Sequence, residues 1–329
     1  MTVTSVSMSG VPRSAQIKTF LRNNASTLLI YGLILLVGGT TAIFAENFRQ
    51  PANLISILRQ SIVIGLLSIG QSMVLLTGGI DMSVAMMART VALVIATIFH
   101  ANSDNSLILP LIVLGIVIGG LLGGVNGTLI TRTHASPFII TLGLAGILRG
   151  VNLAIATTPI RGVPAGYLKI YDAKIGIVPI NVIVMALIWI VAYLFTTRTR
   201  PGRALFAVGG SERVARLSAI KVDRTLLMAY VLSGVCAALA GLFFLARTGV
   251  GDPGTAEGLD FQSIVAVALG GISLYGGKGS IIGTLGGVLL LAIVSNVFNI
   301  VQVNIFYQQL LLGLVVLIAV AAYKSPRSL

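Results

Sequence analysis

Residues 107–131 read LILPLIVLGIVIGGLLGGVNGTLIT, a run without a single ionisable side chain. About 20 apolar residues are enough for a helix to cross the hydrocarbon layer of a membrane. Gly115, Gly119, Gly123 and Gly127 recur every four residues, so on a helix they share one face. Small residues on one face let two membrane helices approach closely. The segment is therefore predicted to be a transmembrane helix in a tightly packed bundle.

The rest of the chain repeats this pattern. Ten apolar segments are predicted at 27–45, 54–77, 82–99, 107–131, 137–158, 177–196, 225–246, 261–275, 280–300 and 305–323. Residues 261–275 are short and glycine-rich, so a short or re-entrant helix is expected there. A second glycine stripe, Gly279, Gly283 and Gly287, lies in a later segment. The predicted fold class is all-α: a polytopic membrane protein of about ten transmembrane helices.

The composition supports this class. The chain of 329 residues is 56% hydrophobic and 9% charged, whereas about 25% charged residues is usual in soluble domains. A soluble enzyme, a disordered tail and a disulfide scaffold are thereby excluded. The formal net charge of +13 comes from 22 Lys/Arg against 9 Asp/Glu. In so apolar a chain, an excess of Lys and Arg is expected to lie in the connections on the cytoplasmic side of a membrane. No nucleic-acid partner is expected.

The distribution of basic residues gives an orientation. With the N-terminus inside, 14 Lys and Arg lie in cytoplasmic connections and 5 in outer ones, while three lie within apolar segments. Both termini are thus predicted to be cytoplasmic: a tail at 1–26, one transmembrane domain at 27–323 with a cytoplasmic connection at 197–224, and a tail at 324–329. The alternative for the start of the chain is a cleaved signal peptide, but its apolar run is longer than usual for one.

No catalytic or metal-binding constellation is evident. Cys236 is the single cysteine, and His100 and His134 are predicted on opposite sides of the membrane. GISLYGGK at 271–278 departs from the phosphate-loop spacing, and Gly279 stands where a Mg²⁺-binding Ser or Thr is required. No metal and no cofactor are expected in this chain.

Polar residues at membrane depth are costly, and so indicate function or pairing. Asp81 and Ser83 follow Gly78-Gly79, where they could cap the next helix or take part in gating. Arg149 lies deep in its segment and must face a cavity or a partner. Arg89 can extend towards the inner surface. Residues assigned to the substrate pathway or to gating are Gln71, Asp81, Ser83, Asn126, Thr141, Arg149, Asn152 and Gln308. For each neutral residue among them, an ordinary interhelical hydrogen bond is the alternative.

The connection 197–224 contains a predicted short amphipathic helix. Ser211 suits its N-cap and Glu212 its first turn. The helix would dock a soluble partner or, alternatively, lie on anionic lipid.

Three stretches together resemble a known family: TGGIDMSV (77–84), PFIITLGLAGILRGVN (137–152), and the run from PGRALFAVGG (201–210) through LSAIKVDRTLLMAYVLSGVCAALAG (217–241) to ALGGISLYGGKGSIIGTLGG (268–287). They look like the permease subunits of ribose/galactose/xylose/arabinose-type ABC importers, a group that includes autoinducer importers. The similarity covers about residues 45–323. It implies a permease in the bacterial cytoplasmic (inner) membrane for a monosaccharide.

The resemblance also implies partners. A second permease, identical or paralogous, would complete the pore in the lipid bilayer, and cytoplasmic ATPase subunits would use ATP and Mg²⁺. An extracytoplasmic sugar-binding protein would deliver the ligand. The coupling residues would be Ser211, Glu212, Arg213, Val214, Arg216 and Leu217. The basic residues of the outer connections are candidates for docking the binding protein: Arg49, Arg161, Lys169, Lys174 and Arg247.

The sequence departs from the family pattern in two places. Ala85 stands where the family usually has Gly, and Arg89 is unusual at its position. A different class of function is also considered, a stand-alone ion-coupled transporter, for which Asp81 is the one plausible ion-binding acid.

Overall fold

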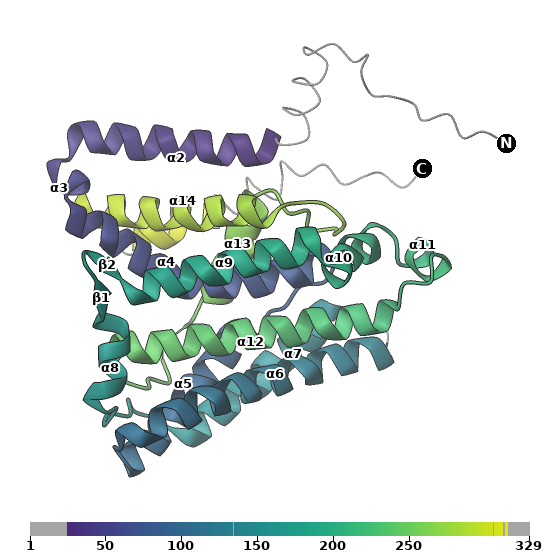
Figure 1. Cartoon of the computed structure of the whole chain (residues 1–329), viewed down its shortest axis with the longest axis horizontal. Coiled ribbons are helices and arrows are strands. Elements are labelled where there is room, and N and C mark those ends of the chain that lie inside the picture. Colours follow the sequence, from purple (N-terminus) through teal and green to yellow (C-terminus); the bar gives the residue numbers. More distant parts are fainter. Residues whose placement is uncertain (1–24, 134, 255, 305, 312, 315–329) are drawn as a thin grey trace.

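The computed structural model describes residues 25–133, 135–254, 256–304, 306–311 and 313–314. Eight helices in this part are long and apolar enough to cross a membrane. Figure 1 shows them running side by side. They are α2 (Ala25–Phe44), α4 (Pro51–Leu76), α5 (Val84–Ala101), α6 (Ile108–Thr133) preceded by the 3-10 turn η1 (Asn105–Leu107), α7 (Pro137–Ile155), α9 (Ile180–Arg198), α12 (Val222–Thr248) and α14 (Ile281–Ile300).

The shorter elements lie near the helix ends. They are α3 (Glu46–Arg49), α8 (Ala165–Asp172), the antiparallel hairpin of β1 (Lys174–Ile175) and β2 (Val178–Pro179), α10 (Arg200–Gly210), α11 (Glu212–Leu217) and α13 (Leu259–Leu269). In Figure 1, α8 and the hairpin lie at the left end of the bundle, and α10 and α11 at the right. These two ends are called the α8 end and the α11 end.

Eight of the ten predicted segments therefore correspond to long helices. The segment 261–275 contains the short helix α13, as expected, and loops flank it on both sides. The segment 305–323 lies mostly outside the described residues, although 306–311 are helical. The tails 1–26 and 324–329 also fall outside the described part, apart from residues 25 and 26. The all-α membrane fold is confirmed, while the count of ten and the position of the termini stay predictions.

The glycine stripe of α6 packs as expected, and so do Gly283 and Gly287 of the second stripe, whereas Gly279 precedes α14 and lies in a turn with a φ of 136°. A side chain at Gly119 or Gly123 would collide with the α12 backbone, at Gly234 and Tyr230 respectively. In α14, Gly287 and Gly283 lie against the backbone of α13 and its C-terminal end, at Ala266 and Gly270. Helices α6 and α12, and α13 and α14, are thus in backbone contact, which only glycine allows at these positions.

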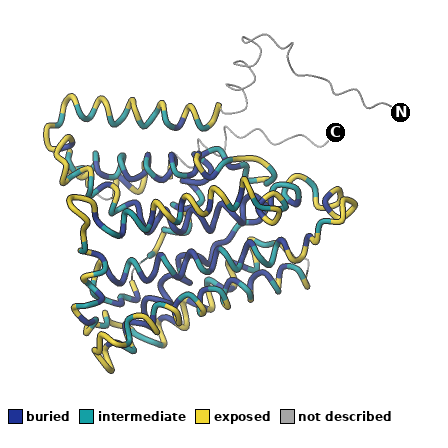
Figure 2. The backbone as a smooth tube through the Cα atoms, viewed as in Figure 1, coloured by how far each residue is buried: buried dark blue, intermediate teal, exposed yellow. Residues whose placement is uncertain are grey.

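Burial separates a core from an outer layer. Helices α4, α5 and α12 carry most of the buried residues, while α2, α6, α7 and α9 expose one face (Figure 2). That face is apolar: Leu36, Leu121 and Val191 are all more than 60% exposed. Leucines and valines exposed in such number would be unfavourable in water. They suit contact with the acyl chains of a membrane, which are as apolar as these side chains.

Candidate functional site

The turn between α4 and α5 holds a fully buried carboxylate, Asp81. Its Oδ1 accepts hydrogen bonds from Ser83 N at 3.0 Å and Ser83 Oγ at 2.6 Å, and its Oδ2 accepts one from Ser233 Oγ of α12 at 2.9 Å. Two donors of the turn and one of the central helix α12 thus stabilise the carboxylate. Burying this acid without such bonds would cost about 3 kcal/mol.

Three further predicted residues join this network. Asn126 Nδ2 donates to Ser83 Oγ at 2.8 Å, and Thr141 Oγ1 accepts from Met82 N at 3.1 Å. The Gln71 amide spans the backbone of Asp81, donating to its O at 3.0 Å and accepting from its N at 3.3 Å. All five side chains are buried. Together with Ser233, these five of the eight residues predicted for the pathway or gating join α4, α5, α6, α7 and α12 around one turn, and their role in transport stays a prediction.

One local expectation about this turn is wrong. Ser83 precedes α5, but its side chain makes no capping bond to the helix. Its hydroxyl donates to Asp81 Oδ1 and accepts from Asn126 Nδ2, so the lone pair that a cap would offer to the helix N–H groups is used by Asn126. Asp81 in turn bonds Ser83 N and does not reach the first N–H groups inside the helix.

Arg149 lies elsewhere, on the exposed side of α7. Its Nη2 is 3.3 Å from Oε1 of Glu257, in the loop that connects α12 to α13, and the two side chains are 66% and 62% exposed. A Cβ added at Gly143, Gly146 or Gly150 of the same helix would meet no other part of the described chain within 4 Å. An exposed charged pair on a membrane helix requires water or a partner protein, as the sequence led us to expect. Glu257 was not anticipated, since nothing in the sequence brings it near α7.

The remaining predicted pathway residues are separate from the Asp81 network. Asn152 of α7 is fully buried, and neither of its amide atoms has a partner in the described chain. Gln308 Nε2 donates to Val303 O at 2.9 Å and to Asn299 Oδ1 at 3.4 Å, closing the turn after α14. Arg89 is 4% exposed, and its Nε and Nη2 have no partner among the described residues.

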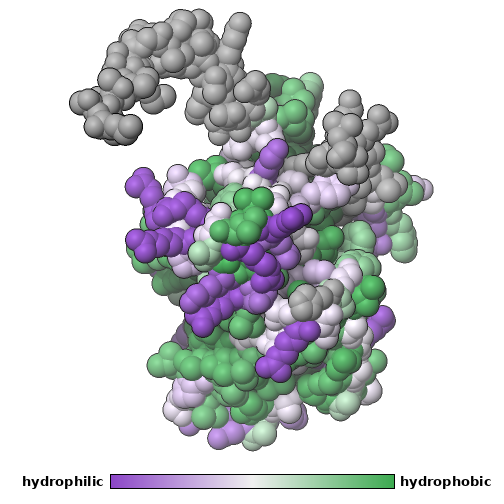
Figure 3. All heavy atoms as spheres, turned by 90° about the vertical axis from the view of Figure 1, so that its right-hand side faces the viewer, coloured by the Kyte–Doolittle hydropathy of each residue, from purple (hydrophilic) through white to green (hydrophobic). Residues whose placement is uncertain are grey.

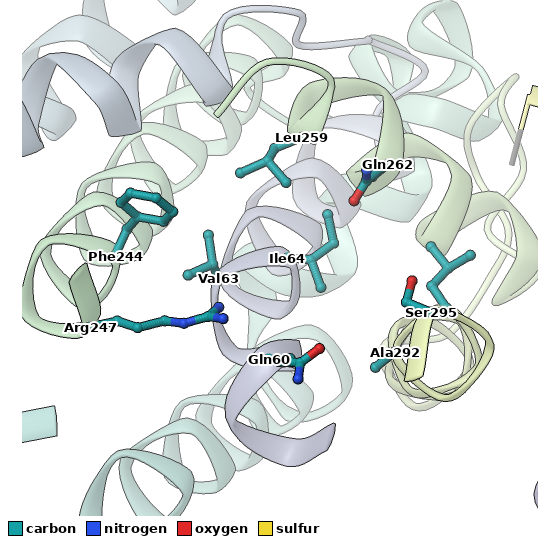
Figure 4. Close-up of a pocket in the computed structure, with 10 residues that line it drawn as sticks. Gln60, Val63, Ile64, Phe244, Arg247, Leu259, Gln262, Ala292 and Ser295 are labelled. Carbon is teal, nitrogen blue, oxygen red and sulfur yellow. The ribbon is translucent and has the colours of Figure 1, made fainter. Parts of the chain in front are cut away.

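Cavities lie on two sides of the short helix α13. One, of about 150 Å³, is bounded by α4, α12, α13 and α14. Figure 4 shows the side chains of Gln60, Arg247, Gln262 and Ser295 pointing into it. A second cavity, of about 370 Å³, lies between α13, α14 and the helical residues after 305, and shares Gln262 and Leu291 with the first. Gln60, Gln262 and Ser295 were missed by the sequence analysis, because isolated amides and hydroxyls in apolar segments do not reveal which face they occupy.

At the α11 end, the predicted coupling residues form α11 and its N-cap. Ser211 Oγ accepts from Val214 N at 3.3 Å, so the predicted cap is confirmed. Arg216 Nη2 donates to Asp223 Oδ1 at 2.7 Å, and this bond raises the pKa of the guanidinium above its ordinary value. Val214 and Leu217 are 59% and 82% exposed. A hollow of about 310 Å³, lined partly by Glu212 and Arg216, lies beside α11.

Three glycine-containing segments meet next to α11. The N–H of Gly277 donates to the carbonyl of Leu76 at 3.0 Å. A Cβ at Gly209 would overlap Leu76 O and Gly277 N, and one at Gly276 would overlap Gly78. This contact is called the glycine junction. It joins the end of α10, the turn that precedes Asp81, and the turn between α13 and α14.

The basic residues predicted to dock a binding protein are at the α8 end. Arg49, Arg161, Lys169 and Lys174 are exposed there. The carbonyl of Arg161 lies 2.7 Å from Nδ1 of His100, which ties the connection after α7 to the end of α5. Arg247 is also exposed, but it is directed towards the cavity of Figure 4. In the described ranges, no three His, Cys, Asp or Glu residues are close enough to hold a metal ion.

Comparison with known proteins agrees with this architecture. Residues 53–320 match the family described as "Branched-chain amino acid transport system / permease component". The chain is 37% identical over 292 residues to a ribose import permease protein of Bacillus subtilis, covering 88% of this chain and 89% of that one. It is 34% identical over 296 residues to a D-allose transport system permease protein of Escherichia coli, covering 88% and 90%.

A fructose import permease protein of Rhizobium meliloti is 32% identical over 316 residues, covering 93% of this chain and 87% of the relative. No solved structure matches the chain. The family match extends over the Asp81 turn, the α7 segment with Arg149, α11 and the glycine junction. This multi-pass membrane protein therefore belongs to the family of transport-system permease components that is named for branched-chain amino acid transport.

Proposed function

We propose that the chain imports a monosaccharide across the bacterial cytoplasmic membrane as the permease of a binding-protein-dependent ABC importer. The observation that carries this proposal is α11: a short capped helix that projects Val214 and Leu217 beside a hollow, in a chain whose relatives are import permeases. Exposed apolar side chains in a basic setting suit docking of a soluble ATPase subunit. The energy for transport then comes from ATP hydrolysis in that subunit.

Surface charge supports an orientation with the α11 end in the cytoplasm. Nine exposed basic residues lie at this end, and hydrophilic side chains gather there (Figure 3). They are Arg132, Arg198, Arg200, Arg203, Arg213, Arg216, Lys221, Arg224 and Lys278. At the α8 end, the exposed bases are fewer and are interspersed with Glu46, Asp104 and Asp172. An excess of Lys and Arg marks the cytoplasmic side.

The relatives favour a sugar over an amino acid as the cargo. The family description names branched-chain amino acids, but the three relatives cited are named for ribose, allose and fructose. An amino acid also requires partners for both an ammonium and a carboxylate. Of the two cavities beside α13, the one of about 150 Å³ is lined by one arginine and no acid, and its other polar groups are amides and a hydroxyl. Such groups suit hydroxyl-rich ligands.

A second permease is proposed to complete the pathway at the exposed side of α7. Arg149, Glu257 and the open glycines of α7 lie there. Two copies that leave a water-filled space between them would hydrate this charged pair. Docking of a sugar-binding protein is proposed at the α8 end, on Arg49, Arg161, Lys169 and Lys174.

Reconstitution of the complex tests the proposal. The chain, a co-expressed ATPase and a sugar-binding protein are purified together, and ATP hydrolysis is measured with a panel of pentoses, hexoses and branched-chain amino acids. We expect the ATPase to co-purify, and the loaded binding protein to accelerate hydrolysis with a sugar. Failure to recover an ATPase, or stimulation by amino acids alone, would contradict the proposal.

A further inference from the structure

We propose that the cavity between α4, α12, α13 and α14 binds one monosaccharide-sized, polyhydroxylated ligand. This space, lined by Gln60, Phe244, Arg247, Gln262 and Ser295 among others, is called the α13 cavity. The inference rests on the proposed function, since it names a site for the cargo inside a single permease chain. It adds a binding site separate from the exposed side of α7.

The polar groups of the α13 cavity lack partners of their own. In the described chain, the guanidinium of Arg247, the amide of Gln262 and the hydroxyl of Ser295 make no hydrogen bond and no ion pair. Elsewhere in these helices, hydroxyls such as Thr248 and Ser263 bond backbone carbonyls. Gln60 uses Nε2 to reach Ser56 at 3.0 Å, which leaves its Oε1 available. Four helices therefore direct unused donors and acceptors into one space.

The rest of the lining is apolar. Phe244, Leu259 and Ile64 face the cavity together with Val63, Leu291 and Ala292. A sugar presents C–H faces as well as hydroxyl edges, and small-molecule sites combine an apolar wall with a few placed polar groups. The aromatic ring of Phe244 provides a flat surface for a C–H face. A purely ionic ligand would find one charge here and little else.

The position of the cavity suits reception of the ligand. Gln60 lies in the first half of α4, Arg247 in the last turn of α12, and Ser295 in the second half of α14. All three positions are nearer the α8 end than the α11 end. In the proposed orientation, the cavity is therefore in the outer half of the membrane, on the side from which a binding protein delivers cargo.

The shortness of α13 makes the space. The helix starts only at Leu259, and the described residues before it, 249–254 and 256–258, are not helical. Interrupted membrane helices are a recurrent way to build substrate sites, because their ends leave polar groups and space within the bundle.

Protection of an introduced thiol by sugar tests the site. Cys236 is the one native cysteine and is buried, so Ser295→Cys places a selectively reactive thiol in the cavity. The control is Asn47→Cys, on the exposed surface of α3 at the same end. Both variants are assembled with the ATPase and the binding protein in proteoliposomes. Maleimide labelling is timed with D-ribose, D-allose, D-fructose or D-glucuronate, and uptake of each sugar is measured in parallel.

We expect the sugar that is taken up to slow labelling of Ser295→Cys about tenfold at ten times its half-saturating concentration, by simple occupancy. Labelling of Asn47→Cys should not change. Gln262→Ala should raise the KM of uptake about fivefold, the equivalent of one lost hydrogen bond. Protection by glucuronate instead of the neutral sugars would identify the ligand as a sugar acid held by Arg247. If Ser295→Cys does not assemble, Gln60→Cys serves the same measurement.

The failures of the two proposals are distinguishable. Normal uptake with undiminished labelling of the cavity thiol would overturn the α13 cavity as a site and leave the importer function standing. Absence of uptake for every sugar by the wild-type complex would overturn the importer function, and the site with it.

Discussion

The glycine junction and the surroundings of α13 are opposite solutions to helix packing within one chain. At the junction, three segments meet through their backbones. A hydrogen bond of 3.0 Å, from the N–H of Gly277 to the carbonyl of Leu76, connects two of them. Beside the first part of α13, at Leu259 and Gln262, the packing leaves cavities of about 150 and 370 Å³, although the C-terminal end of the same helix is in backbone contact with α14. The first arrangement transmits displacement, because packed backbones cannot move independently. The second leaves space for cargo. An importer driven by a cytoplasmic ATPase requires both features: a rigid contact that transmits displacement from the ATPase, and a space that holds the cargo.

The largest effect is expected from filling the glycine junction. Gly209→Val would force a side chain into the carbonyl of Leu76, whereas Gly210→Val, one residue on, has nothing within 4 Å. We expect Gly209→Val to destabilise the protein by about 3 kcal/mol, the upper range of overpacking. The yield of monodisperse protein and its Tm in detergent measure this. Equal behaviour of the two variants would contradict the junction.

The next effect is expected at Asp81, for which the chain contains a matched control. Asp104 makes the same two bonds, to Ser106 N at 2.9 Å and Ser106 Oγ at 2.6 Å, but on the exposed surface. Asp81→Asn replaces an acceptor with a donor in a buried network, at a cost of about 2 kcal/mol. Asp104→Asn should change the Tm little. If both substitutions lower the Tm equally, the buried Asp81 network contributes no more to stability than the exposed bonds of Asp104.

A smaller effect, on association and not on folding, is expected at α11. Leu217→Glu puts a charge on the exposed apolar position, and Ser218→Glu puts it on the next residue, which is also exposed. Loss of one apolar contact should weaken binding of the ATPase about tenfold. Titration of purified ATPase against each variant provides the measurement. Unchanged affinity of Leu217→Glu would remove α11 from the docking surface.

The smallest effect is expected for the Arg149–Glu257 pair. If water reaches this side of α7, as an importer pathway requires, a cycle of Arg149→Gln, Glu257→Gln and the double variant should give a coupling energy below about 1 kcal/mol. The free energy of unfolding of the wild type, the two single variants and the double variant is obtained from the Tm and from denaturant titration. A coupling of several kcal/mol would show that the pair is shielded from water, and would exclude this face as a hydrated pathway.

The sequence predicts the helices and their ends better than it predicts which side chains from different helices contact one another. The eight long helices, the glycine stripe of α6, the pair Gly283 and Gly287 of α14, the short helix near 261–275 and the cap of α11 follow from periodicity and residue type, and the structure has all of them. Asp81, Ser83, Asn126, Thr141 and Gln71 were predicted as pathway or gating residues in one set with Arg149, Asn152 and Gln308, and the sequence could not show that these five form one hydrogen-bonded network. That required the packing of five helices.

The α13 cavity could not be predicted for a related reason. Gln60, Gln262 and Ser295 are far apart in sequence, and each is ordinary where it stands. Whether these side chains line a cavity depends on where α13 begins, and this in turn depends on the loop after Gly249. Arg247 illustrates the same limit: it is exposed, as its charge suggested, but the sequence could not show that its side chain also points into the cavity.

Uptake of a radiolabelled sugar into proteoliposomes tests the central claim most directly, with the permease, ATPase and binding protein present and ion gradients abolished by ionophores. ATP is supplied on the side of the α11 end. The account predicts uptake that requires ATP and the binding protein, persists with ionophores, and is lost in Gly209→Val. Uptake that continues without ATP and collapses with the ion gradient would contradict it, and would make this chain an ion-coupled transporter.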